Sequence, residues 1–169
     1  MPISNPQRFD ALFAKVKARF DQRPRDGLIC KRGFYRSSAV LKLQKASWTN
    51  DPINQVQNVS GIFFCIWINA DSMSKNRAKY NIHALKLRQL NGYLIASRDF
   101  ASDFRNAFAS MSHMWPNVGV DHGPLTLMEG WIAIDASSFE NDILALMDRF
   151  ELLTPLIDRL LESRKKAAR

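Results

Sequence analysis

The residues that could perform chemistry in this 169-residue chain are few and widely spaced. Its three histidines are His83, His113 and His122. Its two cysteines, Cys30 and Cys65, lie in apolar, strand-like runs where buried, reduced thiols are expected. A structural zinc site needs several such ligands at short, regular spacings, and an activated nucleophile needs a base within reach. Because the spacing meets neither requirement, we predict no catalytic residue, no metal site and no cofactor.

One constellation could serve a small hydrolase. His122 could act as a base, with Glu129 and Asp135 following it in the chain. The simpler interpretation is that His122 lies in an exposed turn and that Asp135 ends a strand. The hydrolase hypothesis therefore requires all three side chains to converge in one pocket.

Basic and aromatic residues are interleaved in two parts of the N-terminal half of the chain. Cations beside aromatic rings can bind phosphates and stack on bases, so a nucleic-acid surface is one interpretation. Another is that lysine and arginine protect an exposed sheet edge from pairing with other strands. The candidate contact residues, for nucleic acid or for a protein partner, are Lys31, Arg32, Tyr35, Arg36, Lys42, Lys45, Lys75, Arg77, Lys79, Tyr80 and Arg88.

The net charge is divided unevenly along the chain. The whole chain carries 24 Lys and Arg against 16 Asp and Glu, a formal charge of +8. Residues 1–98 carry a net +12, and residues 99–169 carry a net −4. Either the acidic C-terminal part neutralises the basic part within the molecule, or the basic segments share one exposed face that attracts an acidic partner. Both interpretations stay open at this point.

The first element that could position these groups is an N-terminal helix. Phe9, Phe13, Val16 and Phe20 recur at helical spacing and form one apolar stripe. Pro24 prevents the helix from continuing.

Strand-like runs follow this helix. The longest, 59–69, is apolar on both faces, as is typical of a central strand covered on both sides. Residues 70–80 are polar and basic and are expected to form a loop. The predicted strands are 28–30, 33–36, 40–48, 59–69 and 131–135. Residues 81–90 fit either a strand or a helix, and we favour a strand.

Two further helices are expected in the second half. Aromatic residues at helical spacing predict a helix over 98–115, and a second apolar stripe predicts one from residue 139 onward. Ser137 and Glu140 match the pattern of a capping box at its start. The Thr154-Pro155 pair predicts a kink or a tight turn within this C-terminal helix.

This order of elements lacks regular alternation of strands and helices and predicts an α+β fold. We expect a single domain over residues 1–169, with an ordered core over 6–162 and a frayed basic C-terminus from Lys165. The sheet should be mostly antiparallel, with about four to five strands packed with an N-terminal helix, an aromatic middle helix and a long kinked C-terminal helix. With neither a secretory signal nor a membrane span in the sequence, we predict a cytoplasmic location and no membrane insertion.

Several short motifs carry a resemblance to a known family. They are Gly33-Phe34 with Arg36, Leu43-Gln44-Lys45 with Trp48, the strand through Ile68, the run His83-x-Leu85-x-Leu87-Arg88, and Trp131 before a C-terminal helix. In these motifs the chain resembles a bacterial domain-of-unknown-function family of small α+β proteins. The resemblance implies the same fold class and brings no assigned activity.

The leading hypothesis for function is a non-enzymatic binding protein with a protein partner, of an immunity or regulatory type. An aromatic-rich sheet covered on one face would leave an apolar groove for such a partner. The alternative is a nucleic-acid-binding protein that uses the basic N-terminal strands and the segment 75–88. A small hydrolase is the third hypothesis, and no feature of the sequence indicates an oligomeric state.

Overall fold

Five segments with alternating side chains pair into one antiparallel sheet in the computed structural model, which describes residues 5–57 and 60–167. The strand order follows the chain, and every neighbouring pair is antiparallel. With the helices packed on it, the sheet confirms the predicted α+β fold. The strands are β1 (Leu28–Tyr35), β2 (Ser38–Lys45), β3 (Gly61–Ile68), β4 (Arg77–Leu85) and β5 (Thr126–Ala133).

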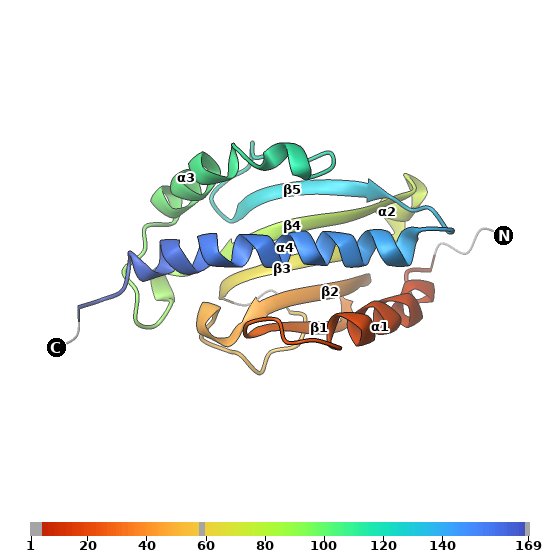
Figure 1. The fold of residues 1–169 in the computed structure, drawn as a ribbon, viewed down its shortest axis with the longest axis horizontal. Coiled ribbons are helices and arrows are strands. Elements are labelled where there is room, and N and C mark those ends of the chain that lie inside the picture. Colours follow the sequence, from red (N-terminus) through yellow and green to blue (C-terminus); the bar gives the residue numbers. More distant parts are fainter. Residues whose placement is uncertain (1–4, 58–59, 168–169) are drawn as a thin grey trace.

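The three long helices pack against one face of this sheet. The longest, α4 (Phe139–Glu162), crosses the middle of the face, with α1 (Arg8–Phe20) on one side of it and α3 (Ser97–Phe108) on the other (Figure 1). The short helix α2 (Ala70–Ser74) connects β3 to β4, and three 3-10 turns cover Ala46–Trp48, Leu87–Gln89 and Ser112–Met114. In the part of the chain that the structure describes, no helix is both long and apolar enough to cross a membrane.

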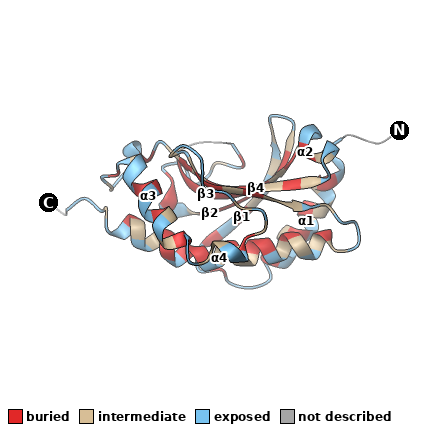
Figure 2. Cartoon of the chain, turned by 90° about the horizontal axis from the view of Figure 1, so that it is seen from above, coloured by how far each residue is buried: buried red, intermediate tan, exposed pale blue. Residues whose placement is uncertain are grey.

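The main core lies between the sheet and the helices. Figure 2 shows buried residues along the sheet and along the side of α4 that faces it. The ring of Phe64 on β3 stacks on that of Phe150 on α4, with the centroids 4.6 Å apart. The indole of Trp48 packs edge-on against the same Phe64 ring. This layer buries the predicted apolar stripe of α1, so that burial of aromatic surface holds the sheet to its helices.

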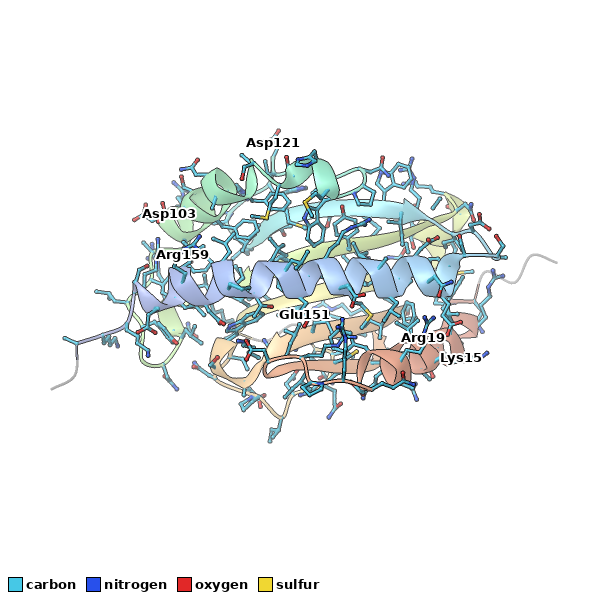
Figure 3. The ribbon with its side chains drawn as sticks, viewed as in Figure 1. Lys15, Arg19, Asp103, Asp121, Glu151 and Arg159 are labelled. Atoms are coloured by element: carbon cyan, nitrogen blue, oxygen red, sulfur yellow. The ribbon has the colours of Figure 1, made fainter. Side chains whose placement is uncertain are left out.

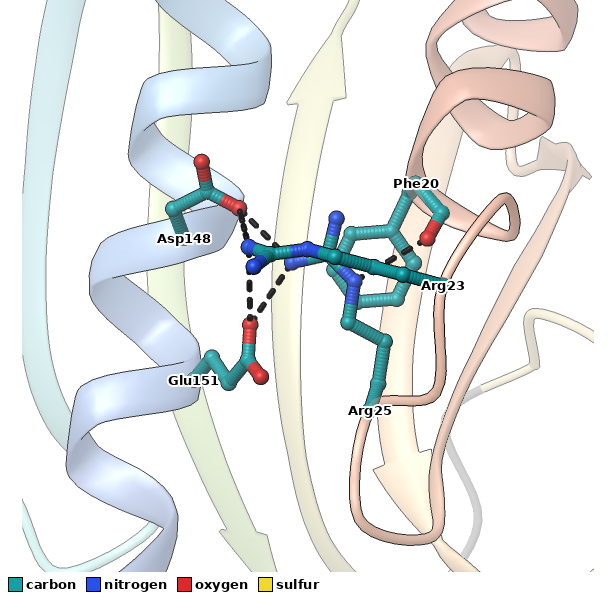
Figure 4. A network of polar contacts seen from close by, with 5 residues as sticks. All are labelled: Phe20, Arg23, Arg25, Asp148 and Glu151. Carbon is teal, nitrogen blue, oxygen red and sulfur yellow. Dashed lines mark hydrogen bonds and ion pairs between the residues drawn. The ribbon is translucent and has the colours of Figure 1, made fainter.

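A buried arginine holds the turn after α1 against α4. The Arg25 side chain is 6% exposed, and its Nη1 lies 2.8 Å from Asp148 Oδ1 and 2.7 Å from Glu151 Oε2 (Figure 4). Its Nε donates to the carbonyl of Phe20, and its guanidinium lies 4.0 Å from the centroid of the Phe20 ring. Arg23 approaches the same two carboxylates from a position that is 62% exposed.

Cations of the basic half pair with carboxylates of the acidic half at several places. Besides Arg25, Lys45 on β2 lies 2.7 Å from Asp158 on α4. Figure 3 shows the charged side chains around the helical layer, among them Arg19 on α1 and Glu151 on α4. The acidic helices thus neutralise part of the basic charge within the molecule.

Two local predictions are wrong. Residues 70–80 form α2 and the start of β4 instead of a loop, because Asn69 caps α2 through Ser72 and Asn76 turns the chain in a left-handed conformation. At the start of α4, the residue before the helix is Ser138, and its side chain makes no capping hydrogen bond. The predicted capping box fails because Ser137 bonds to Asp135 instead.

Other boundaries also differ from the predictions. Of the two alternatives at Thr154-Pro155, the tight turn is wrong, because α4 continues through Pro155 as one helix. The helix α3 ends at Phe108 instead of 115. The C-terminal segment does not fray at Lys165: the backbone N–H of Lys166 donates to the carbonyl of Gly92. Observed β3 begins at Gly61, and the predicted start at residue 59 lies outside the described residues, as do residues 168 and 169.

Candidate functional site

The face of the sheet opposite α1, α3 and α4 is here called the helix-free face. Strand alternation places Val40 of β2, Cys65 and Trp67 of β3, and Asn81 and His83 of β4 on it. Their sequence neighbours on these strands point into the main core. The prediction that the central strand is covered on both sides is correct for β3, but helices cover only one of its two faces.

The loop over residues 50–57 covers one part of this face. Val56 of the loop belongs to a second, small apolar cluster with Val40, Phe63 and Cys65. Lys31 of β1 holds the loop to the sheet, because its Nζ donates a hydrogen bond of 2.7 Å to the carbonyl oxygen of Pro52. Apolar packing and hydrogen bonds therefore hold the loop in place without secondary structure of its own.

Lys42 of β2 is the second anchor of this loop. Its Nζ lies 3.1 Å from Asn54 Oδ1 and 3.3 Å from the carbonyl oxygen of Gln57. It also lies 4.6 Å from the centroid of the Phe63 ring. Burial, with the nearby charge of Lys31, lowers the pKa of Lys42 to about 8. Lys42 is therefore a buried structural amine rather than an exposed contact.

Beside this loop, the helix-free face is hollowed into a groove of about 370 Å³. Apolar side chains of β2 and β3 form one part of its lining, and polar side chains of β4 and β5 form another. We call this hollow the groove. Its lining residues are Tyr35, Arg36, Ser38, Val40, Val56, Cys65, Trp67, Asn69, Asn81, His83, Thr126 and Glu129.

A polar pair lies on β4 at the groove. The Nδ2 atom of Asn81 lies 3.1 Å from Nε2 of His83. Burial lowers the pKa of His83 to about 4, with Lys42 adding to the effect and Glu129 opposing it, so the ring is neutral at pH 7. The Phe63 ring packs against the His83 ring at a centroid distance of 4.8 Å.

Asn81 is 2% exposed, and its Oδ1 has no hydrogen-bond partner among the described residues. A buried polar atom left in this state costs about 1–3 kcal/mol. Such atoms are uncommon in folded proteins, and each one points to a specific cause. Here the residue lines a groove, which makes a bound group the natural partner.

The rim of the groove is formed by the two-residue turn between β1 and β2. Both turn residues have positive φ, 48° at Arg36 and 64° at Ser37. A two-residue hairpin of this type favours Asn and Gly at these positions, because other residues are strained there. The guanidinium of Arg36 lies 5.2 Å from the centroid of the Tyr35 ring. The turn therefore holds an exposed arginine and a tyrosine at the rim despite the strain.

Cation–aromatic pairs extend along the same face beyond the groove. The guanidinium of Arg77 lies 3.8 Å from the centroid of the Trp131 ring. Lys79 lies 5.4 Å from the Trp67 ring and 3.3 Å from a carboxylate oxygen of Glu129. The positive charge of Lys79 is thus partly neutralised on the sheet.

The structure brings six of the predicted contact residues to the helix-free face. Two of them, Lys31 and Lys42, are occupied in holding the loop 50–57. The six are Lys31, Tyr35, Arg36, Lys42, Arg77 and Lys79. Lys75 lies on the surface after α2 and pairs with Asp71, and Arg88 is exposed in the 3-10 turn after β4.

Three predicted contact residues lie elsewhere, which corrects their assignment to one basic surface. Arg32 pairs with Asp10 of α1, and Lys45 pairs with Asp158, both on the helical side of the sheet. Tyr80 is fully buried in the main core, and its hydroxyl donates to the carbonyl of Pro116 at 2.6 Å. Since Lys79 and Tyr80 are neighbours on a strand, they cannot point to the same face.

The residues of the hydrolase hypothesis do not meet. Glu129 lines the groove, whereas exposed His122 lines a different hollow beside α3. Asp135 accepts hydrogen bonds from the backbone and hydroxyl of Ser137, which lower the pKa of its carboxyl. Within residues 5–57 and 60–167, no three His, Cys, Asp or Glu side chains are grouped closely enough to hold a metal ion.

The two cysteines are free and buried on opposite faces of the sheet. Burial raises the pKa of each thiol to about 12, so neither is ionised at pH 7. This agrees with the expectation of reduced thiols.

Among the groove residues, only Tyr35 and Arg36 were predicted contacts. Sequence reasoning missed Trp67, Asn81 and His83 as contact residues, and it considered Glu129 only for the hydrolase. The signal that could have found them was alternation. With the strand started at Arg77, every second residue through His83 is polar, while the intervening residues are apolar or aromatic.

Comparison with known proteins adds nothing to this assignment, because no family model, no curated protein and no solved structure matches the chain.

Proposed function

We propose that this protein is a non-enzymatic binding protein that takes up a segment of a partner protein in the groove. The observation that carries the proposal is the one-sided packing of the sheet, which leaves a hollow of about 370 Å³ on the helix-free face. Hollows of this size, with apolar walls and a few convergent polar groups, are typical of binding sites. The partly exposed rings of Tyr35 and Trp67 are the kind of side chain that anchors protein interfaces.

The charges around the groove favour a protein over a nucleic acid. Lys31 and Lys42 are occupied by the loop, and Lys79 is paired with Glu129. The Glu129 carboxylate would repel a phosphate placed beside it. Affinity for nucleic acid depends on cations that are free to neutralise phosphates, and Arg36 is the one cation lining the groove among the described residues.

One observation supports the nucleic-acid alternative. Arg36 and Arg77 lie beside the rings of Tyr35 and Trp131 on a single sheet face. Aromatic rings next to cations form a stacking platform for single strands. The alternative predicts retention on single-stranded RNA or DNA that falls steeply as the salt concentration rises. The proposal predicts no retention at low salt.

Photo-crosslinking in the cells that make the protein tests the proposal. One variant carries p-benzoylphenylalanine in place of Tyr35 at the groove rim. The matched control carries it in place of Leu152, which is 65% exposed on α4. The proposal predicts an adduct from position 35 that protease removes and nuclease does not. An adduct from position 152 alone, or a nuclease-sensitive adduct from position 35, would contradict it.

The biological setting of this binding is also proposed. An immunity or regulatory role and a cytoplasmic location follow from the sequence-based hypothesis, and the identity of the crosslinked protein tests both. A secreted toxin or a regulated enzyme in the adduct would support such a role. A structural protein of the cell envelope would contradict the location.

A further inference from the structure

The polar part of the groove offers a hydrogen-bond acceptor that no described residue uses. Asn81 is 2% exposed and lines the groove, and its Oδ1 has no partner within the described ranges. Asn81 has a strand on each side, because it lies opposite Cys65 of β3 and opposite Glu129 of β5. Neither neighbour donates to it: the structure gives Cys65 no hydrogen bond to this oxygen, and a carboxylate is an acceptor only.

His83 offers a donor on the same strand face. Since Nδ2 of Asn81 donates to Nε2 of His83 at 3.1 Å, the neutral ring carries its proton on Nδ1. Burial lowers the pKa of His83 to about 4, which keeps the ring neutral at pH 7. The pair therefore presents one acceptor, Asn81 Oδ1, and one donor, His83 Nδ1–H.

Neither a cation nor a carboxylate fits this pair of atoms. A cation would need the Glu129 carboxylate, which Lys79 already holds at 3.3 Å. Arg36 at the rim adds further positive charge on the same face. A carboxylate has no proton to donate to Asn81. The group that satisfies both atoms is uncharged and carries a donor and an acceptor side by side.

We propose that Asn81 and His83 form a recognition site for an uncharged carboxamide, supplied by an Asn or Gln side chain of the partner protein. The amide N–H of that side chain donates to Asn81 Oδ1, and its carbonyl accepts from His83 Nδ1–H. Val40 and Trp67 provide apolar surface for its methylene groups. This inference rests on the proposed function and specifies what the groove recognises.

Three small probes of nearly identical shape test the inference: acetamide, acetate and acetamidinium. Each is titrated into the isotope-labelled protein at constant ionic strength, while the side-chain signals of Asn81 and His83 are followed by NMR. Acetamide should shift both signals and saturate at concentrations on the order of millimolar, because so small a ligand makes few contacts. Acetate and acetamidinium should leave them in place. Equal shifts from either ion, or none from acetamide, would overturn the inference.

Variants separate recognition from general effects of the probe. In Asn81→Ala, the acetamide-induced shift of His83 should fall at least tenfold. In Asn106→Ala, which removes an exposed amide on α3, it should be unchanged. If Asn81→Ala does not fold, His83→Leu, which removes the donor, serves instead, and the acetamide-induced shift of Asn81 should fall at least tenfold. A protein adduct from position 35 combined with no acetamide effect would leave the proposed function standing and remove the carboxamide assignment alone.

Discussion

The Nζ atom of Lys42 lies 3.1 Å from Oδ1 of Asn54 and fixes the loop 50–57 to the helix-free face. Lys42 is 1% exposed, and its amine contacts only neutral oxygens and the Phe63 ring among the described residues. Within the described residues, no carboxylate lies at ion-pair distance from it. A buried ammonium without a counter-ion is costly, so burial lowers its pKa to about 8.

Lys42 should make the stability of the protein depend on alkaline pH. Its pKa is about 8 in the folded protein against an ordinary value of 10.5, so between these values the unfolded chain binds more protons. The free energy of unfolding therefore gains a contribution as the pH rises through this window. Urea unfolding of the wild type and of Lys42→Met at pH 7.5 and pH 10 measures it. The wild type should gain stability relative to the variant, and a constant or falling difference would refute the assignment.

Arg25 should contribute far more to stability than Arg23, although both approach the same carboxylates. Arg25→Ala removes a buried guanidinium and leaves Asp148 and Glu151 without it, at a cost of about 2–3 kcal/mol once the partial exposure of both acids is considered. Arg23→Ala removes an exposed pair and should cost less than about 0.5 kcal/mol. Urea denaturation compares the two variants. Equal losses would show that the buried arginine does not hold the turn.

The strained turn at the rim should trade stability for binding. Replacing Arg36-Ser37 by Asn-Gly places residues that tolerate positive φ in the left-handed conformation and should stabilise the fold by about 1–2 kcal/mol. The same change removes the arginine from the groove rim and should weaken partner binding. Thermal unfolding and partner affinity measured on one preparation test both effects. A turn that loses stability, or a stabilised turn that binds as well as the wild type, would contradict this account.

Gly130 of β5 should tolerate no side chain. A Cβ at this position would lie 2.5 Å from Cζ of Tyr80, inside van der Waals contact. Tyr80 is held in the core by its hydrogen bond to Pro116, so it cannot move away freely. Gly130→Ala should destabilise the protein by about 1–3 kcal/mol. Gly123→Ala is the matched control, because its Cβ would meet nothing within 4 Å. Similar melting temperatures for the two variants would show that Tyr80 is mobile.

Much of the fold could be predicted from the sequence because its signals are local. The stripe from Phe9 to Phe20 forms α1, and the doubly apolar run through Ile62 and Ile68 forms the central strand. The start of β4 was missed because polar residues such as Lys79 alternate there with buried ones. These polar residues lie on the helix-free face of the sheet. Polar residues on such a face look like a loop when the partner strands are unknown.

An apolar groove on an uncovered sheet face was expected, but its position and its full lining could not be predicted from sequence patterns. It depends on the pairing of β4 with β5 and on the docking of loop 50–57, contacts between residues far apart in the chain. Whether each cation is paired within the molecule or exposed depends on the same contacts. Lys45 is paired on the helical side, whereas Arg36 is exposed at the groove rim. No spacing rule separates these two cases.

The affinity of the crosslinked partner, once purified, shows whether binding depends on the groove. Isothermal titration calorimetry compares the wild type with Trp67→Ala in the groove and Leu152→Ala on the outer side of α4. An aromatic anchor is worth about 2 kcal/mol or more, so Trp67→Ala should weaken binding roughly thirtyfold while its melting curve stays cooperative. Leu152→Ala should bind like the wild type. Full affinity in Trp67→Ala together with a large loss in Leu152→Ala would place the binding surface on the helical side and contradict the account.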